Sequence, residues 1–194
     1  MTTTANHSSD FDHLPHLCPY WIAWLLASPV RRLGEDPAKL AATVASPGDR
    51  VLELGPGLGF YTLPLARRVG PSGRIIAIDS QQVMLDELAR RCERAKLHDR
   101  VELRLGGDPL DAVDLKESID VVVLVNVVHE TQDPADLFVR IAEVLRPGAK
   151  VLLREPSGHC SRQLFEQELR WAGAAGLSMI SQGKMVATLR AGSR

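Results

Sequence analysis

The sequence predicts an α/β protein built as a three-layer, Rossmann-like, doubly wound sheet. Strand-like and helix-like segments alternate between residues 50 and 154, which is the pattern of right-handed βαβ crossovers. The segment 119–128 (IDVVVLVNVV) is continuously apolar, as in a strand of a parallel sheet that helices cover on both faces. Two strand-like segments, 176–182 and 184–191, are separated only by Gly183. This spacing is too short for a crossover helix and predicts an antiparallel hairpin.

Length, composition and charge fit one ordinary domain without a nucleic-acid partner. The 194 residues are 45% hydrophobic and 24% charged, which suits a single α/β core. With 23 Lys and Arg against 24 Asp and Glu, the net charge is -1, without the basic excess typical of phosphate-backbone binding. The basic residues between positions 90 and 96 are interpreted as a solvated helix face, with Glu87 and Arg91 at the i,i+4 spacing of an ion pair. A local nucleic-acid patch is the less favoured alternative.

The sequence also predicts a cytoplasmic protein with no membrane partner. Cys18, Cys92 and Cys160 are scattered and form no CxxC pair, so a disulfide framework or a structural zinc site is not expected and a reducing compartment fits. The first ten residues are polar and lack the pattern of a secretory signal. The most apolar early stretch, 20–27, is too short to span a bilayer.

The expected organisation is a disordered tail, an N-terminal helical cap and a Rossmann-like core, of which the last two form one domain (13–194); the three segments are 1–12, 13–48 and 49–194. In the cap, one short helix is expected before Pro29 and a second over 37–45, where Pro37 occupies the first turn. In the core, strands are expected at 50–54, 74–78, 100–105, 119–128 and 150–154. Helices are expected at 60–69, 81–96, 134–145 and 161–175, with a shorter one at 109–116.

The stretch VLELGPGLGF (residues 51–60) predicts a ligand site. It places Gly55, Gly57 and Gly59 directly after the first strand. In an open α/β sheet, ligands bind at the carboxyl ends of the strands, and glycines there let the backbone turn tightly and approach the ligand. One glycine would suffice for a turn, so three at alternate positions favour a ligand.

The spacing of this motif distinguishes between ligands. The third glycine arrives one residue earlier than in the dinucleotide fingerprint GxGxxG, and Phe60 takes its place. Glu53 precedes the loop, and a carboxylate there suits a ligand with a cationic end. Asp79 ends the second strand, where an acidic side chain can accept hydrogen bonds from ribose hydroxyls. Asp108 follows the third strand, within reach of an adenine amino group.

Together these residues resemble the class I S-adenosylmethionine-dependent methyltransferases, over about residues 37–190. The strand IDVVVLVNVVHE, the segment RPGAKVLLREP and the closing hairpin belong to the same resemblance, and VVHE with EPSGH looks like a small bacterial and archaeal subgroup. The resemblance implies a seven-stranded sheet whose last strand is antiparallel, with S-adenosyl-L-methionine as cofactor. The glycine loop would hold the methionine part, and Asn126 would lie under the sulfonium. The residues assigned to the cofactor are Glu53, Gly55, Pro56, Gly57, Gly59, Asp79, Ser80, Asp108 and Asn126.

Methyl transfer from a sulfonium needs no enzymatic nucleophile, because the carbon is already activated, but a general base helps when the acceptor must lose a proton. His129, Glu130 and His159 are the candidate catalytic residues, since they follow adjacent strands. They allow three interpretations: a divalent metal site with a carboxylate, a histidine base oriented by a carboxylate, or purely structural roles. No metal is assigned. A thiol or metalloid role for Cys18 and Cys160 is a weaker alternative, because free cysteines are more often buried hydrophobes.

The acceptor pocket is expected to form from the N-terminal helices and the loops after the fourth and fifth strands, with Tyr20, Trp24 and Glu155 as lining residues. The aromatic residues could instead pack in the core or form a dimer interface, so a homodimer is possible. A compact pocket favours a small-molecule acceptor. The resulting hypothesis is a small-molecule methyltransferase; the alternatives are a non-catalytic binder of the same cofactor and a nicotinamide-dependent (NAD) oxidoreductase, against which Phe60 and the antiparallel tail argue.

Overall fold

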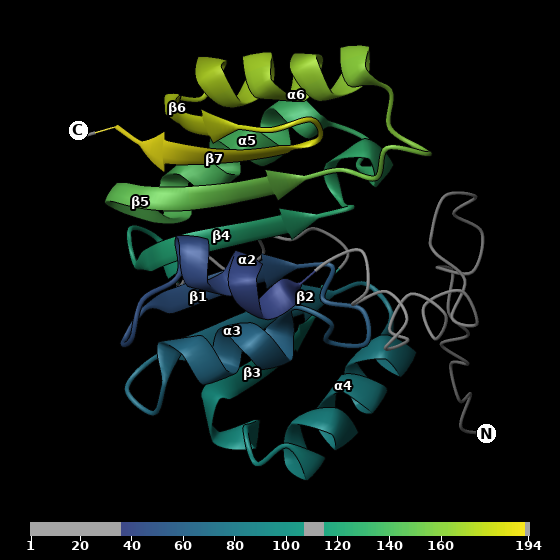
Figure 1. Ribbon diagram of the computed structural model, residues 1–194, viewed down its shortest axis with the longest axis vertical. Coiled ribbons are helices and arrows are strands. Elements are labelled where there is room, and N and C mark those ends of the chain that lie inside the picture. The colour runs from purple at the N-terminus through teal and green to yellow at the C-terminus, as the bar shows by residue number, and fades with distance from the viewer. Residues whose placement is uncertain (1–35, 107–114, 193–194) are drawn as a thin grey trace, which may run out of the picture.

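The computed structural model describes residues 36–106 and 115–192, and they form a sheet of seven strands in the order β3-β2-β1-β4-β5-β7-β6 (Figure 1). The pairings of β5 with β7 and of β6 with β7 are antiparallel, and the other pairings are parallel. The expected seven strands with an antiparallel last strand are therefore confirmed. The strands are β1 (Arg50–Leu54), β2 (Arg74–Asp79), β3 (Val101–Leu105), β4 (Ile119–Val125), β5 (Leu145–Arg154), β6 (Leu177–Gln182) and β7 (Val186–Ala191).

Helices cover both faces of the sheet. The helices α2, α3 and α4 pack with one set of strand residues, and α5 and α6 pack with the opposite set. The described helices are α2 (Pro37–Val44), α3 (Thr62–Val69), α4 (Gln82–Arg94), α5 (Pro134–Val144) and α6 (Arg162–Ala174), with short 3-10 turns η2 (His98–Arg100) and η4 (Val128–Glu130). None of the helices in these residues is long and apolar enough to cross a membrane.

Local sequence signals explain where three of the helices begin. The Asp36 carboxylate accepts hydrogen bonds from the N–H groups of Ala38 and Lys39 at the start of α2. Asp133 caps α5 and Ser161 caps α6 in the same way. Such side chains satisfy N–H groups that have no partner within the helix.

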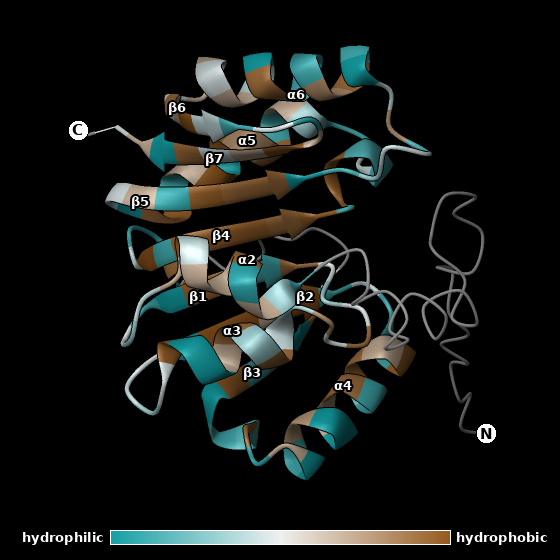
Figure 2. Ribbon diagram, viewed as in Figure 1, coloured by the Kyte–Doolittle hydropathy of each residue, from teal (hydrophilic) through white to brown (hydrophobic). Residues whose placement is uncertain are grey.

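Strand β4 is the centre of the core. Val121 and Val123 pack under one helical layer, and Val122 and Leu124 pack under the other. None of the four is more than 1% exposed, which confirms that this apolar run is buried on both faces. Figure 2 shows the same strand as a nearly continuous hydrophobic band.

Two strand boundaries differ from the sequence predictions by three or more residues. Strand β4 ends at Val125 rather than at residue 128, because Asn126 adopts a φ of 57° and the chain then enters η4. Strand β5 begins at Leu145 rather than at residue 150, because Leu145 pairs with Ile119 ahead of an irregularity in the register. The predicted tail at 1–12, the helix before Pro29 and most of the helix at 109–116 lie outside the described residues.

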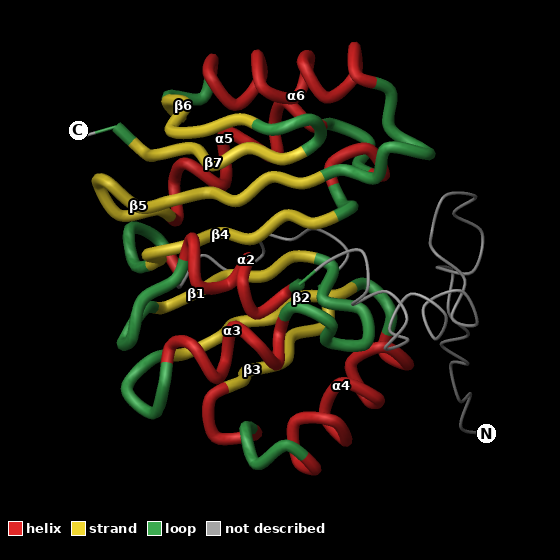
Figure 3. Tube along the Cα trace, in the orientation of Figure 1, coloured by secondary structure: helices red, strands yellow, loops and turns green. Residues whose placement is uncertain are grey.

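The loops that follow the parallel strands lie at one edge of the sheet. The segments that follow β1, β2, β4 and β5 all leave the sheet at the carboxyl ends of these strands (Figure 3). Strand β1 lies between β2 and β4, so the glycine loop is central in this group. The fold therefore places Gly57, Asp79 and Glu155 at the same edge of the sheet.

Candidate functional site

The glycine loop is held tightly on both sides and open in the middle. The Gly55 N–H donates to the Ile78 carbonyl at 2.9 Å. Gly55, Gly57 and Gly59 have φ values of 63°, 51° and 80°, a region that favours glycine. A Cβ atom on Gly59 would lie 2.4 Å from the Leu88 side chain, whereas one on Gly57 would meet nothing within 4 Å. The loop thus leaves room over Gly57 for a ligand.

Asp79 connects this loop to the end of β2. Its Oδ2 atom accepts a hydrogen bond from the Gly57 N–H at 3.1 Å, and its Oδ1 atom accepts one from the Gln81 N–H at 2.9 Å. Burial raises the pKa of this carboxyl, and the backbone donors act in the opposite direction. The predicted partners Pro56 and Ser80 lie on the same two loops, Pro56 buried and Ser80 exposed.

Glu53 is a buried carboxyl beside the glycine loop. Only 3% of it is exposed, and its Oε2 atom has no hydrogen-bond partner within the described part of the chain. Burial raises its pKa to about 7, the Thr62 hydroxyl lowers it, and the nearby Asp79 charge raises it. An unsatisfied buried carboxyl is costly unless a ligand completes it. A cationic group suits this position.

Asn126 marks the end of β4 with a strained backbone. Its φ of 57° lies in the left-handed region, which non-glycine residues adopt at a cost. Its N–H donates to the Arg154 carbonyl at 2.8 Å, which joins the ends of β4 and β5. Strain of this kind is common at binding and catalytic sites.

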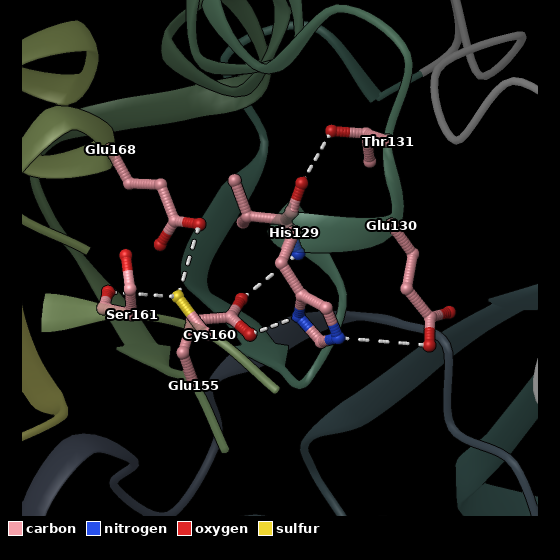
Figure 4. Close-up of polar contacts among 8 residues, drawn as sticks. His129, Glu130, Thr131, Glu155, Cys160, Ser161 and Glu168 are labelled. Carbon is pink, nitrogen blue, oxygen red and sulfur yellow. Dashed lines mark hydrogen bonds and ion pairs between the residues drawn. The ribbon is translucent and has the colours of Figure 1, made fainter. Parts of the chain in front are cut away.

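The most specific polar contact of the site joins His129 to Glu155 (Figure 4). The Nδ1 atom of His129 pairs with Oε2 of Glu155, and Oε1 of Glu155 accepts the Val128 N–H at 3.0 Å. The Glu155 side chain is fully buried, and that of His129 is 14% exposed. The hydrogen bond to Glu155 raises the pKa of His129, although burial lowers it. The imidazole is thus oriented, and its basicity is increased.

Glu130 lies near this pair with a looser contact, and the charge of His159 influences Glu130. The Glu130 Oε1 atom is 3.8 Å from the His129 Nε2 atom. Burial raises the pKa of Glu130, the His129 and His159 rings lower it, and the charges of Glu155 and Asp79 raise it. His159 itself is exposed. Among the residues that the structure describes, no three His, Cys, Asp or Glu side chains are placed to hold a metal.

Sequence reasoning missed Glu168, which lies behind Glu155. It is fully buried on α6, and its Oε1 atom is 3.9 Å from the Cys160 sulfur (Figure 4). Burial and then the Glu155 charge raise its pKa to about 8, and burial raises the pKa of the Cys160 thiol to about 12. Glu168 shares the buried face of α6 with Phe165 and Ala172, so a carboxyl within that apolar stripe was the available signal.

Four of the singled-out residues lie outside the described part of the chain: Tyr20, Trp24, Cys18 and Asp108. A cavity of about 240 Å³ lies far from the carboxyl edge, beside Leu145 and Leu177, where β5 and β6 begin. It therefore does not belong to the site formed by the glycine loop and His129.

Comparison with known proteins agrees with this geometry. Residues 51–148 match the model of the family described as methyltransferase domain, so the chain belongs to the class I S-adenosylmethionine-dependent methyltransferases. The resemblance and the cofactor that it implies are confirmed, and family membership goes against the oxidoreductase alternative.

Three similar proteins illustrate the relationship. A demethylmenaquinone methyltransferase of Lactobacillus johnsonii is 33% identical over 57% of this chain and 45% of its own length. An arsenite methyltransferase of Halobacterium salinarum is 34% identical over 59% of this chain and 29% of its own length. A crystal structure of an S-adenosylmethionine-dependent methyltransferase from Aquifex aeolicus superimposes with a TM-score of 0.76 at 21% identity, covering 90% of this chain and 98% of the other. The chain thus spans less than half the length of these two curated relatives.

Proposed function

We propose that this chain transfers a methyl group from S-adenosylmethionine to a small-molecule acceptor that loses a proton to His129. The observation that carries the proposal is the pairing of His129 Nδ1 with the buried Glu155 carboxylate at the carboxyl edge. This pairing leaves Nε2 as the basic atom of the neutral ring. Family membership supports the reaction class.

The residues at the glycine loop fit the cofactor. Glu53 offers a buried, unsatisfied carboxyl to a cationic group, and the space over Gly57 admits a ligand close to the backbone. Asp79 retains lone pairs for hydroxyl groups in addition to its two backbone donors. Asn126 would hold its place at the end of β4, under the sulfonium. When bound, S-adenosylmethionine supplies a methyl group on a positively charged sulfur.

His129 would take the acceptor proton at Nε2. Glu155 orients the ring and stabilises the imidazolium that results, as a buried carboxylate does beside other histidine bases. Glu130 lies 3.8 Å from the same nitrogen and would help to position the acceptor together with His159. Such proton transfer contributes roughly 10²–10⁴-fold to a rate, and the remainder of the acceleration would come from alignment of the reactants.

The acceptor class is inferred from the pocket and from the relatives. Tyr20 and Trp24 are proposed to line the acceptor pocket, and Glu155, whose side chain is fully buried, to contribute to it through His129. The name of the relative from Lactobacillus johnsonii supports a small molecule. A role for Cys160 in thiol or metalloid chemistry is disfavoured, because the sulfur is buried and its pKa is raised to about 12. We also predict a cytoplasmic protein without a nucleic-acid or membrane partner, with a homodimer through the aromatic residues of the N-terminal helices as an alternative use of those residues.

A turnover assay with isotopically labelled S-adenosylmethionine tests the proposal. The wild-type protein is mixed with panels of phenols, quinols and amines, and formation of S-adenosylhomocysteine is measured beside cofactor affinity by calorimetry. Acceptor-dependent turnover supports an enzyme. Tight cofactor binding without turnover on any acceptor would favour the non-catalytic binder, and tighter binding of NAD than of S-adenosylmethionine would overturn the cofactor assignment.

A further inference from the structure

Helix α4 packs directly against the glycine loop. The Leu88 side chain occupies the space that a Cβ atom on Gly59 would need. One turn further along α4, the Arg91 Nη1 atom donates a hydrogen bond to the Leu58 carbonyl oxygen at 3.0 Å. Leu58 is the residue between the second and third glycines, and it is 3% exposed. The helix therefore holds the loop both by packing and by a charged donor.

A buried carboxylate fixes the Arg91 guanidinium in this position. Glu87 is 5% exposed, and its two oxygens accept hydrogen bonds from Arg91 Nε at 3.3 Å and from Arg90 Nε at 3.0 Å. Burial would raise the pKa of Glu87, but the hydrogen bonds and charges of the two arginines lower it. The side chain of Arg91 is 21% exposed and that of Arg90 is 57% exposed. Both arginines pair with the Glu87 carboxylate, and Arg91 in addition donates a hydrogen bond to the glycine loop at Leu58.

The contact completes a set of restraints on the loop backbone. The Gly57 N–H is held by Asp79 at 3.1 Å, and the Gly59 N–H is held by the Pro56 carbonyl at 2.9 Å. Arg91 holds the carbonyl of the peptide group that carries this Gly59 N–H. Both ends of that planar group are thereby fixed. The direction of the peptide group between Gly57 and Leu58 is then set by its two restrained neighbours.

We propose that Arg91 is a positioning residue for cofactor binding, acting through the Leu58 carbonyl on the loop that receives the amino-acid part of the cofactor. The proposal rests on the cofactor assigned by the family. Arg91 acts through the backbone of the glycine loop, so we expect it to affect binding of the amino-acid part of the cofactor and not of the adenosine part. Loss of its contact lets the loop reorient, so that affinity falls for ligands that carry the amino-acid part.

The matched pair Arg91→Gln and Arg90→Gln tests this inference. Each substitution removes one charged partner of Glu87, and the change at Arg91 also removes the donor to Leu58. Calorimetry with S-adenosylhomocysteine should show an affinity about tenfold weaker for Arg91→Gln, as expected for one lost charge-assisted hydrogen bond, and little changed for Arg90→Gln. With 5′-methylthioadenosine, which lacks the amino-acid part, the two variants should bind alike. Thermal unfolding of both variants measures the loss of stability separately.

Several outcomes would overturn the inference. If the two variants bound S-adenosylhomocysteine with equal affinity, the inference would be overturned and the cofactor assignment would stand. The same holds if Arg91→Gln lost equal affinity for both ligands. A wild-type protein that bound neither ligand would overturn the cofactor assignment and this inference with it. If Arg91→Gln does not fold, Arg91→Lys keeps the charge beside Glu87 but lacks the planar fork of donors, and it should show the same selective loss.

Discussion

The Nδ1 atom of His129 lies against the carboxylate of Glu155, a buried residue at the end of the neighbouring strand β5. The other oxygen of Glu155 accepts the backbone N–H of Val128, so this carboxylate cannot rotate without losing a second bond. A carboxylate is an acceptor and selects the tautomer with a proton on Nδ1. The relationship fixes both the orientation and the tautomer of the proposed base.

Replacement of the proposed base gives the first prediction. His129→Ala should reduce kcat by roughly 10²–10⁴-fold, the usual contribution of a general base, because the variant lacks the Nε2 atom that takes the proton. Affinity for S-adenosylhomocysteine should stay within a small factor of wild type. His159→Ala also removes an imidazole, but an exposed one, and should reduce turnover less. Wild-type turnover in His129→Ala would sink the assignment of the base.

The second prediction concerns the tautomer and the pH profile. The hydrogen bond to Glu155 raises the pKa of His129 above its ordinary 6.5, and a base must be neutral. The wild-type kcat/KM should therefore rise with pH through a value above 6.5. Glu155→Gln places an amide that can donate to Nδ1, which moves the ring proton to Nε2. This variant should be as slow as His129→Ala at every pH, and a wild-type profile would contradict the tautomer argument.

The third prediction is a pH-dependent stability carried by Glu168. Its pKa is about 8 in the folded protein against an ordinary value of 4.5, so the folded state binds the proton more tightly. Stability from this group is present below pH 4.5 and is lost as the pH rises through 8. Between these two pH values, the Glu168 carboxyl lowers the free energy of unfolding by at most about 1.4 kcal/mol per pH unit. Glu168→Gln, measured by urea unfolding from pH 5 to pH 9, should show a shallower decline than wild type.

A control on the same helix separates this effect from a general change of charge. The Glu166 side chain is 42% exposed and pairs with Arg162 one turn away. Glu166→Gln, measured over the same interval, shows how much of the change in slope follows from the loss of any carboxylate on this helix. Equal slopes for wild type and Glu168→Gln would show that Glu168 titrates normally in the folded protein.

The fourth prediction compares two glycines of the loop. Alanine in the left-handed region costs about 1–2 kcal/mol at either position. At Gly59 the added Cβ also meets Leu88 at 2.4 Å, and overpacking adds about 1–3 kcal/mol. Urea unfolding should therefore show the larger destabilisation for Gly59→Ala. Gly57→Ala places its methyl group in the open space over the loop. Relative to its loss of free energy of unfolding, it should therefore lose more cofactor affinity than Gly59→Ala.

Most of the fold could be predicted from the sequence because the relevant signals are local. The alternation of apolar segments located the seven strands, and the single Gly183 between the last two forced the hairpin. The end of β4 was wrong because Asn126 turns the chain through a strained φ that apolar character does not reveal. The start of β5 was missed because Leu145 joins the sheet by pairing with Ile119, a contact distant in sequence.

The candidate site was predictable where its residues stand at the ends of strands that the sequence also predicted. The glycine motif follows β1 and Asp79 ends β2, two strands that the sequence predicted, and in the structure the Gly57 N–H donates to Asp79. The roles of Glu168 and Arg91 depend on what packs against their helices. Arg91 was interpreted as part of a solvated face, yet it reaches Leu58, which is 33 residues away in the chain. Spacing within a helix predicts its ion pairs and not its distant partners.

The placement of β7 has a consequence for how the protein is made. This strand lies between β5 and β6, although it follows both in the chain, and chains fold from the N-terminus as they leave the ribosome. Until β7 emerges, β5 has an open edge on which a foreign strand can pair. Until then the Glu155 N–H also lacks its hydrogen-bond acceptor, the Met185 carbonyl. A nascent chain would thus acquire its histidine–carboxylate pair in final form only after β7 had been translated.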